Sequence, residues 1–256
     1  MLIPMTVVGL IHPGEMGSQV AQTLVAQGVQ VVYAAVGRSA ETRRRAEETG
    51  LDDVGDVSTL AARSDIVISV CPPHAAEDVA ASVSGFSGTY VDANAVSPDT
   101  VRAVAGHLPG AAFVDGGIVG PPPHEPGTTR LYVSGPHADQ VVTLFAGSNL
   151  ETVTVPGAVG AASSVKMAYA AWTKGTAALI LAIRSLARSE GVEPTLLAEW
   201  ARSQPDLEAR SERAADSATA KGWRWVGEME EIADTFDQAG LPDGFHRAAA
   251  EIYRRG

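Results

Sequence analysis

Two glycines near the start of the chain have the spacing of a nucleotide-binding turn. Gly14 and Gly17 lie between a short apolar run rich in β-branched residues and a segment with helical spacing, Ser18–Gln27. Such glycines let the backbone approach a pyrophosphate, and the following helix N-terminus offers N–H groups and a positive dipole end. His12 occupies the first glycine position of the usual G-x-G-x-x-G pattern, and a tight turn without a ligand is the alternative interpretation. The predicted cofactor contacts of this segment are Gly9, His12, Pro13, Gly14, Glu15, Met16 and Gly17.

The end of the second predicted strand indicates which dinucleotide the turn would hold. An NAD site normally has an acidic residue there, whereas the 2′-phosphate of NADP needs cationic and hydroxyl groups. Strand Val29–Ala35 is followed by Arg38 and Ser39, with Arg43 one turn into the next helix, and no acid occupies the strand end. A guanidinium can donate two parallel hydrogen bonds to a phosphate. We therefore predict NADP(H), with Arg38, Ser39 and Arg43 as contacts; arginines on a solvated helix face are the alternative.

Strands and short helices alternate through the first part of the chain. This alternation predicts an α/β fold with a Rossmann-like, doubly wound and mostly parallel sheet. Loops are expected after several strands, among them Cys71–His74 and Gly116–Pro123. The composition changes at Pro156. We predict an NADP-binding Rossmann-like domain over residues 1–158 and an all-α domain over residues 159–256.

The second part of the chain is predicted to be helical throughout. Ala161–Ser189 contains no proline and one glycine, and it is apolar over most of its circumference. We expect one long helix that is buried on several sides, and a homodimer built on it. Further helices are expected at residues 194–203, 206–221, 226–239 and 243–255. Residues that either line a pocket or belong to the core are Trp223, Trp225, Glu228, Met229 and His246.

The overall composition excludes several kinds of function. A net charge of −11 opposes binding to nucleic acid or to an anionic membrane. The single cysteine, Cys71, rules out internal disulfides, and the six histidines lack ligand spacing, so no metal site is predicted. No segment is long and apolar enough to span a bilayer. Because the first strand is expected to open at Met5, with no signal sequence before it, we expect a soluble cytoplasmic protein with a small-molecule substrate.

A series of short motifs resembles the β-hydroxyacid dehydrogenase and 6-phosphogluconate dehydrogenase superfamily over nearly the whole chain. The motifs are G-L-I-H-P-G-E-M-G, an R-S pair, C-P-P, D-A-N-A-V-S-P, D-G-G-I-V-G and G-A-A-S-S-V-K-M. The chain is most similar to short members with a compact helical C-terminal domain. The resemblance implies an NADPH-linked oxidoreductase with Lys166 as the catalytic acid/base, since an ammonium can protonate a carbonyl oxygen that receives a hydride. Further cofactor contacts that it implies are Cys71, Pro72, Pro73 and Asn94.

The sequence departs from the superfamily pattern at two places. The asparagine usual three or four residues after the lysine is replaced by Tyr169 and Ala170, and Tyr169 is either a second catalytic residue or part of the core. Val119 stands where a serine usually holds a substrate carboxylate, so a hydroxyacid is not assured. The remaining candidates for substrate contact are Ser97, Gly116 and Gly117. Two alternatives follow: an NADPH-dependent imine reductase, which commonly has Asp or Tyr in place of the lysine, and a non-catalytic dinucleotide-binding protein.

Overall fold

The computed structural model describes residues 6–255 of the chain, so the predicted start of the first strand at Met5 lies outside the described residues. Contacts divide the chain into two units, Met1–Lys166 and Met167–Gly256. The division lies inside a long helix, further along the chain than the predicted boundary at residue 158. The first turn of that helix belongs to the N-terminal unit because it is hydrogen-bonded to the sheet.

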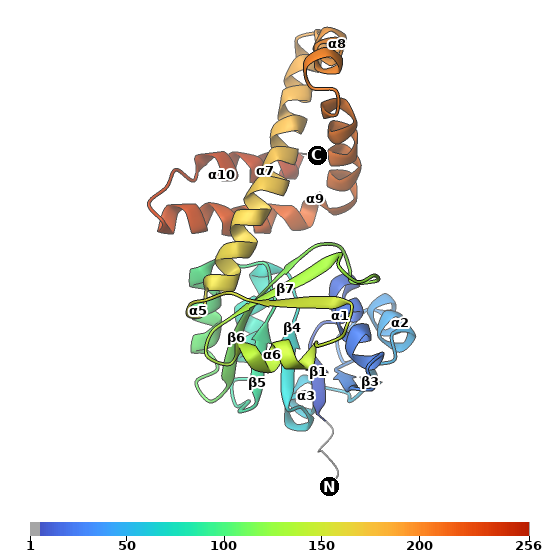
Figure 1. Cartoon of the computed structure of the whole chain (residues 1–256), viewed down its shortest axis with the longest axis vertical. Coiled ribbons are helices and arrows are strands. Elements are labelled where there is room, and N and C mark those ends of the chain that lie inside the picture. Colours follow the sequence, from blue (N-terminus) through green and yellow to red (C-terminus); the bar gives the residue numbers. More distant parts are fainter. Residues whose placement is uncertain (1–5, 256) are drawn as a thin grey trace. The chain divides into compact units, whose positions relative to one another are not determined.

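The N-terminal unit is built on an eight-stranded sheet (Figure 1). The strands are β1 (Val7–Leu10), β2 (Gln30–Tyr33), β3 (Asp52–Asp53), β4 (Ile66–Ser69), β5 (Thr89–Asp92), β6 (Ala112–Val119), β7 (Thr129–Ser134) and β8 (Leu150–Thr154). Their order is β3-β2-β1-β4-β5-β6-β7-β8, and every neighbouring pair is parallel except β6 and β7. The predicted Rossmann-like sheet is confirmed. Its order reverses between β1 and β4, where such sheets bind ligands at the carboxyl ends of their strands.

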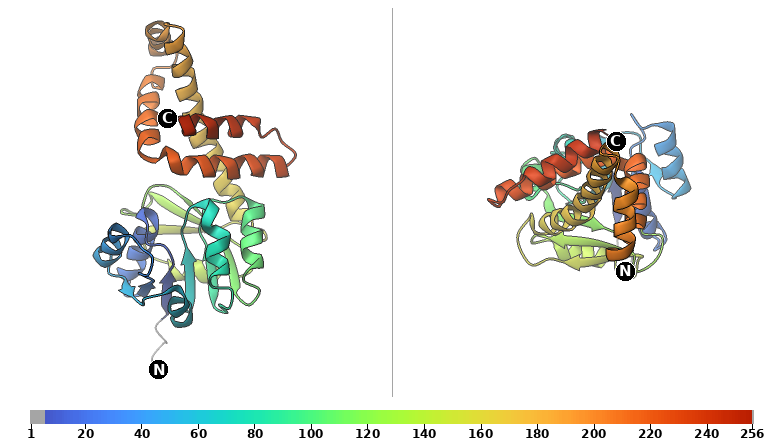
Figure 2. Two further views of the ribbon diagram at one scale, coloured as in Figure 1. Left: turned by 180° about the vertical axis from the view of Figure 1, so that it is seen from behind. Right: turned by 90° about the horizontal axis from the view of Figure 1, so that it is seen from above.

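Helices cover both faces of this sheet. They are α1 (Glu15–Val25), α2 (Ala40–Glu48), α3 (Val57–Arg63), the 3-10 turn η1 (Pro73–Ala75), α4 (Ala76–Ala81), α5 (Pro98–Gly106) and α6 (Ala138–Leu144). One apolar core lies under α1, α2 and α6, and the other lies under α3, α4 and α5. Figure 1 shows α6 in front of the sheet, and the view from behind in Figure 2 shows α4 and α5 on the opposite face. With both faces covered, ligands have access at the ends of the strands.

Strand β6 is longer than predicted. The strand was expected to end at Asp115 and to be followed by a loop, but it continues to Val119 and pairs in antiparallel register with β7. The two glycines suggested a loop, yet here they permit close packing: a Cβ on Gly116 would lie 2.9 Å from the carbonyl oxygen of Asp92. The loop prediction is therefore wrong for Gly116–Val119. These residues extend β6 beyond the carboxyl end of β5.

The helical unit begins within the long helix α7 (Ala161–Ser189), whose ends agree with the prediction, and continues with α8 (Glu193–Ser203), α9 (Leu207–Gln238) and α10 (Gly244–Arg255). The predicted break between residues 221 and 226 is wrong, because α9 runs through it. Figure 1 shows α9 changing direction near its middle. Gly222 is buried there, with Tyr253 of α10 3.9 Å from the place of a Cβ. Packing against α10 thus outweighs the low helix propensity of glycine.

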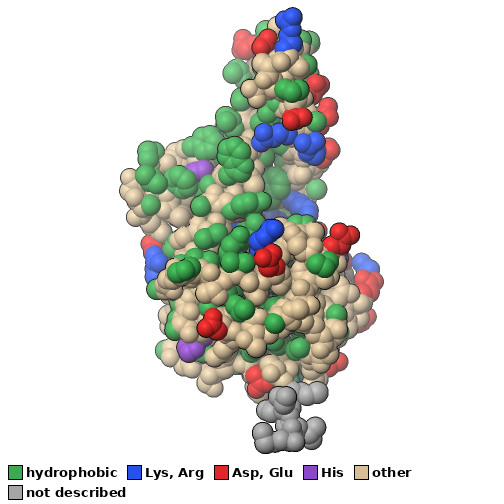
Figure 3. Space-filling model, viewed as in Figure 1, with side chains coloured by type: hydrophobic (Ala, Val, Ile, Leu, Met, Phe, Trp, Pro, Cys, Tyr) green, Lys and Arg blue, Asp and Glu red, His purple; other side chains and the backbone are tan. Residues whose placement is uncertain are grey.

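In the single chain that the structure describes, one side of α7 is exposed. Trp172, Leu179 and Leu186 are 64%, 43% and 63% exposed, and their spacing of seven residues places them along one side of the helix. Other exposed large apolar residues of this unit are Tyr169, Val192, Trp223, Leu241 and Phe245. Figure 3 shows apolar side chains, in green, gathered on this unit.

None of the described helices has the length and apolar character needed to cross a membrane.

Candidate functional site

The turn after β1 forms without backbone strain at His12. The His12 carbonyl accepts a hydrogen bond from the Gly14 N–H at 2.8 Å, and within residues 6–255 no residue other than glycine has a positive φ. Gly17 packs against the same carbonyl, since a Cβ on Gly17 would lie 2.4 Å from the His12 oxygen. The fold therefore requires glycine at position 17 but not at position 12.

Gly14 has no such structural requirement. Its φ of −72° and ψ of −173° are ordinary for any residue, and a Cβ on it would meet no atom within 4 Å. Gly14 is the N-cap of α1, and as a glycine it has no side chain with which to cap the helix. A helix N-terminus with open space beside its N-cap can receive an anionic group through its N–H groups and dipole. The first turn, formed by Glu15, Met16 and Gly17, lies at this position.

Arg38, His12 and Cys71 lie near one another after the carboxyl ends of β2, β1 and β4. Burial, followed by the charge of Arg38, lowers the pKa of His12 to about 4, so the imidazole is neutral near pH 7. Burial raises the pKa of the Cys71 thiol to about 12. The Nε of Arg38 and the Nδ1 of His12 are buried without a hydrogen-bond partner in the described part of the chain, and no described acid pairs with Arg38. The cluster thus holds one cation that lacks an anion.

Ser39 and Arg43 form the N-terminal end of α2 beside Arg38. The Ser39 hydroxyl caps the helix by accepting a hydrogen bond from the Thr42 N–H at 3.2 Å. The Arg43 guanidinium donates to the Arg38 carbonyl at 2.9 Å. Both side chains remain exposed. Each therefore supports the Arg38 loop and stays accessible to a ligand.

Asn94 connects the ends of β4 and β5. Its Oδ1 accepts a hydrogen bond from the Cys71 N–H at 2.6 Å, and its Nδ2 donates to Asp92 at 2.8 Å and to Ser69 at 3.2 Å. The residue is 2% exposed. Its amide therefore serves the protein itself, by fixing the turn that leads into Pro72 and Pro73.

Ser97 and Tyr169, which were predicted as a substrate contact and a catalytic residue, lie in the N-terminal cap of α5 and on α7. The Ser97 hydroxyl caps α5 by accepting from the Thr100 N–H at 3.1 Å, and Ser97 is 1% exposed. Its hydroxyl is thus directed to its own helix. Tyr169 lies on α7 within the helical unit and is 48% exposed.

Asp115, which is not among the predicted site residues, fixes the start of α7. It is fully buried, and its Oδ2 accepts from the N–H groups of Gly160, Ala162 and Ser163 at 2.8, 2.9 and 3.1 Å and from the Ser134 hydroxyl at 2.7 Å. Its Oδ1 accepts from the Ser163 hydroxyl at 2.6 Å. Charge-assisted hydrogen bonds and the positive helix end stabilise the buried carboxylate. The first turn of α7 is thereby attached to β6.

Lys166 follows this turn and contacts the extended part of β6. Its Nζ donates a hydrogen bond to the Ile118 carbonyl at 2.7 Å. A Cβ on Gly117 would lie 2.8 Å from the Cβ of Lys166, so the glycine permits this close approach. Asp115 pairs with Asp92, the last residue of β5, and Ile118 lies three residues further along. The lysine ammonium therefore lies toward the carboxyl ends of the parallel strands.

Both ends of the chain match known families. Residues 7–95 match the family described as NADP oxidoreductase coenzyme F420-dependent, and residues 187–256 match a domain of unknown function, DUF1932. A curated protein of Methanothermus fervidus, described as an uncharacterized 28.5 kDa protein in the 7S RNA 5′ region, is 33% identical over 192 residues, which cover 74% of each chain.

Solved structures extend the similarity to the whole chain. A conserved protein of unknown function, described as structurally similar to 3-hydroxyacid dehydrogenases, is 27% identical with a TM-score of 0.71 over 97% of this chain and 96% of that one. A conserved hypothetical protein from Sinorhizobium meliloti 1021 is 29% identical with a TM-score of 0.71 over 98% and 88% of the two chains. The fold alone is shared with a reductive aminase from Aspergillus terreus, solved with NADPH and ethyl levulinate, at 20% identity and a TM-score of 0.61 over 98% and 93%.

The chain belongs to the β-hydroxyacid dehydrogenase-like superfamily. Within it, the chain and the Methanothermus fervidus protein are members of one family. The predicted superfamily is confirmed, and the part of the chain with the glycine turn is the part that matches the NADP oxidoreductase family.

In this member of the superfamily, the carboxyl edge of the sheet carries two sets of groups. The first set surrounds the N-terminus of α1 and comprises the glycine turn, Arg38 and the turn fixed by Asn94. The second set comprises Lys166 and the β6 segment beneath it. No group of three or more metal-binding side chains occurs among the described residues. The arrangement suits an anionic dinucleotide next to a proton donor.

Proposed function

We propose that the protein transfers a hydride between NADP(H) and a small carbonyl or hydroxy compound, hydroxyacid-like in character, with Lys166 as the general acid/base. The observation that carries this proposal is the position of Lys166, whose Nζ is held by the Ile118 carbonyl at 2.7 Å. Asp115 and Gly117 fix the helix and the strand on either side of this contact. A proton donor mounted this firmly loses little freedom when it acts.

The cofactor fits the residues around α1. The diphosphate would lie at the α1 N-terminus beside Gly14, where a Cβ would meet no protein atom. The 2′-phosphate would supply the anion that Arg38 lacks, with Ser39 and Arg43 adjacent to it. Of the remaining predicted contacts, we assign Gly9, His12, Pro13, Glu15, Met16, Cys71, Pro72, Pro73 and Asn94 to shaping the cofactor site. When bound, NADPH supplies the hydride.

Lys166 accounts for the proton in the reaction. As a carbonyl carbon gains a hydride and its C–O π bond breaks, negative charge develops on the oxygen. The Lys166 ammonium donates a proton to that oxygen and is left neutral, then takes a proton from solvent. In the oxidative direction the neutral amine removes the hydroxyl proton. Tyr169 would donate a hydrogen bond to the substrate, and Ser97, Gly116 and Gly117 would shape the substrate site.

Replacing Lys166 tests this assignment. We expect Lys166→Met to lower turnover by roughly 10²–10⁴-fold, while NADPH affinity, measured by fluorescence titration, stays within about twofold. Lys221→Met, at an exposed lysine of α9, is the matched control and should retain wild-type turnover. Unchanged turnover of Lys166→Met would refute the assignment.

An imine reductase is the second candidate, because Tyr169 presents an exposed phenol three residues after Lys166 on the same helix. A panel of hydroxyacids, ketones and cyclic imines, assayed with NADPH or NADP⁺, separates the two reactions. Preference for cyclic imines, with activity lost in Tyr169→Phe and kept in Lys166→Met, would favour the imine reductase. Tight NADPH binding without turnover on any of these compounds would favour a non-catalytic protein.

The homodimer is supported by the exposed apolar side of α7. Trp172, Leu179 and Leu186 lie seven residues apart and would be covered by a second copy of the chain. Analytical ultracentrifugation should find a dimer for the wild type and a monomer for Leu179→Glu with Leu186→Glu. A matched pair of exposed polar positions, Glu199→Gln and Glu212→Gln, should leave the dimer intact.

A further inference from the structure

A pocket with a volume of about 310 Å³ lies within the helical unit, between α7 and α9. It is large enough for a small organic molecule. Ala177, Ile180 and Ala214 give it an apolar wall, and Ile180 and Ala214 are buried. The other lining residues are Thr173, Lys174, Thr176, Arg210, Arg213, Ser217 and Trp225.

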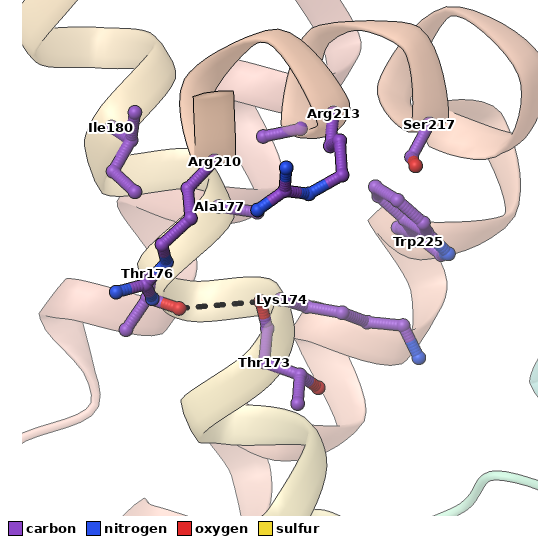
Figure 4. Close-up of a pocket in the computed structure, with 10 residues that line it drawn as sticks. Thr173, Lys174, Thr176, Ala177, Ile180, Arg210, Arg213, Ser217 and Trp225 are labelled. Carbon is purple, nitrogen blue, oxygen red and sulfur yellow. Dashed lines mark hydrogen bonds between the residues drawn. The ribbon is translucent and has the colours of Figure 1, made fainter. Parts of the chain in front are cut away.

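Two arginines of this pocket have charges that no described residue neutralises. Arg210 and Arg213 are three residues apart on α9, so they lie on the same side of the helix. Asp206 and Asp216 lie one turn away and are available for ion pairing, yet no ion pair or hydrogen bond joins either guanidinium to a described residue. Figure 4 shows both arginine side chains extending from α9 toward α7. The guanidinium groups are therefore directed to the pocket.

Three other polar residues of the pocket, Lys174, Thr173 and Thr176, are already paired. Lys174 forms an ion pair with Glu228, and both side chains are largely buried. The hydroxyls of Thr173 and Thr176 donate to carbonyls of their own helix. The pocket thus presents two unpaired positive charges beside an apolar wall, and Trp225 adds an aromatic surface whose ring packs edge-on against Tyr253.

We propose that this pocket binds a small organic anion through a phosphate or carboxylate group held by Arg210 and Arg213. Guanidinium groups bind such oxyanions with paired, charge-assisted hydrogen bonds. The apolar part of the ligand would lie against Ile180 and Trp225. Because the chain carries a net charge of −11, the attraction must come from these local charges rather than from the overall field.

The pocket is separate from the features used in the proposed function. All its residues belong to the helical unit, whereas the glycine turn, Arg38 and Lys166 belong to the N-terminal unit. It also differs from the side of α7 assigned to the homodimer. Successive residues of a helix point about 100° apart, so Thr173, Ala177 and Ile180 face a different direction from the stripe of Trp172, Leu179 and Leu186.

Calorimetric titration of the full chain with phenyl phosphate tests the proposal, with inorganic phosphate, benzoate and uncharged benzyl alcohol as further probes. We expect saturable binding of phenyl phosphate that Arg210→Gln with Arg213→Gln weakens by at least about tenfold. The matched control, Arg63→Gln with Arg202→Gln, removes the same charge at two exposed arginines without a described partner and should bind like the wild type. Binding of inorganic phosphate but not benzoate would assign a phosphate ligand, and the reverse would assign a carboxylate.

Modification by phenylglyoxal, followed by peptide mass spectrometry, tests the same residues in the wild-type chain. Phenyl phosphate should protect Arg210 and Arg213 and leave Arg63 and Arg202 reactive. Absence of saturable binding up to about 10 mM, equal weakening in both double variants, or equal binding of benzyl alcohol would overturn the proposal. The proposal would also be overturned if Arg210→Gln with Arg213→Gln changed the oligomeric state in the absence of any probe. The two arginines would then contact a second copy of the chain rather than a small anion.

Discussion

The N-termini of α1 and α7 present the same physical problem and meet it in opposite ways. Each helix begins with backbone N–H groups that have no partner within the helix, at a positive dipole end. At α7, three such groups donate to the buried carboxylate of Asp115. At α1, the N-cap is Gly14, which has no side chain with which to cap the helix, and the space beside it is open.

This difference separates a structural role from a binding role at one edge of the sheet. The carboxylate of Asp115 is a permanent part of the protein, so it holds the first turn of α7 in place and thereby fixes the position of Lys166. At the α1 N-terminus the acid of the first turn, Glu15, is exposed and the space beside Gly14 is open, so the N–H groups there can bind the phosphates of a cofactor. The comparison predicts that changes at α7 act on stability and geometry, whereas changes at α1 act on cofactor affinity.

Removing the built-in anion should have the largest effect on stability. Asp115→Ala leaves buried N–H and hydroxyl donors without an acceptor, and we expect a loss of about 4 kcal/mol in the free energy of unfolding, measured by urea denaturation. Asp139→Ala, at an exposed acid in the first turn of α6, is the control and should change little. A similar small loss in both variants would mean that Asp115 does not secure α7.

The two glycines of the α1 turn should separate fold from binding. Gly17→Ala places a Cβ 2.4 Å from the His12 oxygen, so we expect it to cost roughly 1–3 kcal/mol of stability. Gly14→Ala meets no protein atom and should leave the stability nearly unchanged. It should nevertheless weaken NADPH binding by at least about tenfold, because its methyl group would occupy the space of the diphosphate. Unaltered NADPH affinity in Gly14→Ala would place the diphosphate elsewhere.

Local periodicity made much of this fold predictable. The bounds of α7 and the alternation that gives the Rossmann-like sheet follow from the spacing of apolar residues over many positions. The glycine turn and Arg38 could be predicted because each lies directly after a strand, where sequence position determines location in such a sheet. Strand β3 was not predicted, since its two residues, Asp52 and Asp53, lack an apolar pattern.

The remaining features depend on contacts between distant residues. Gly116 and Gly117 suggested a loop, but their function is to bring β6 close to Asp92 and to Lys166. Asp115 gave no signal, because an aspartate at a strand end is common and its partners on α7 lie 45 to 48 residues away. Gly222 suggested a helix end, whereas packing against α10 keeps α9 continuous.

Arg38 should control the choice between the two dinucleotides. Arg38→Ala removes the cation proposed to pair with the 2′-phosphate, so NADPH binding should weaken about 10–100-fold, and NADH binding should change little. The control is Arg44→Ala, since Arg44 is exposed and pairs with Glu48; it should keep the preference for NADPH. Fluorescence titration of each variant with NADPH and with NADH gives the Kd values for this comparison. If Arg38→Ala weakened the binding of NADPH and of NADH equally, Arg38 would not be the residue that binds the 2′-phosphate.

His12 should give the most direct report on the α1 N-terminus. Its pKa is about 4 in the folded chain, below the ordinary value of 6.5, so between these values the unfolded chain binds a proton that the folded chain does not. Its contribution therefore lowers stability as the pH falls from 6.5 toward 4, by up to about 1.4 kcal/mol per pH unit, and stops changing below 4. Urea denaturation at several pH values should show less acid sensitivity for His12→Gln than for the wild type.

Bound NADP⁺ should raise the pKa of His12, because phosphates at the α1 N-terminus would favour the imidazolium over the neutral ring. NMR titration of the imidazole with and without NADP⁺ measures this directly. A similar titration of His107, which is near Glu77 on the N-terminal unit, serves as the control and should not respond to NADP⁺. If the pKa of His12 stayed at about 4 in the complex, the phosphates would lie away from α1. The N-terminus of α1 would then have no binding role to set against the structural role of the α7 N-terminus.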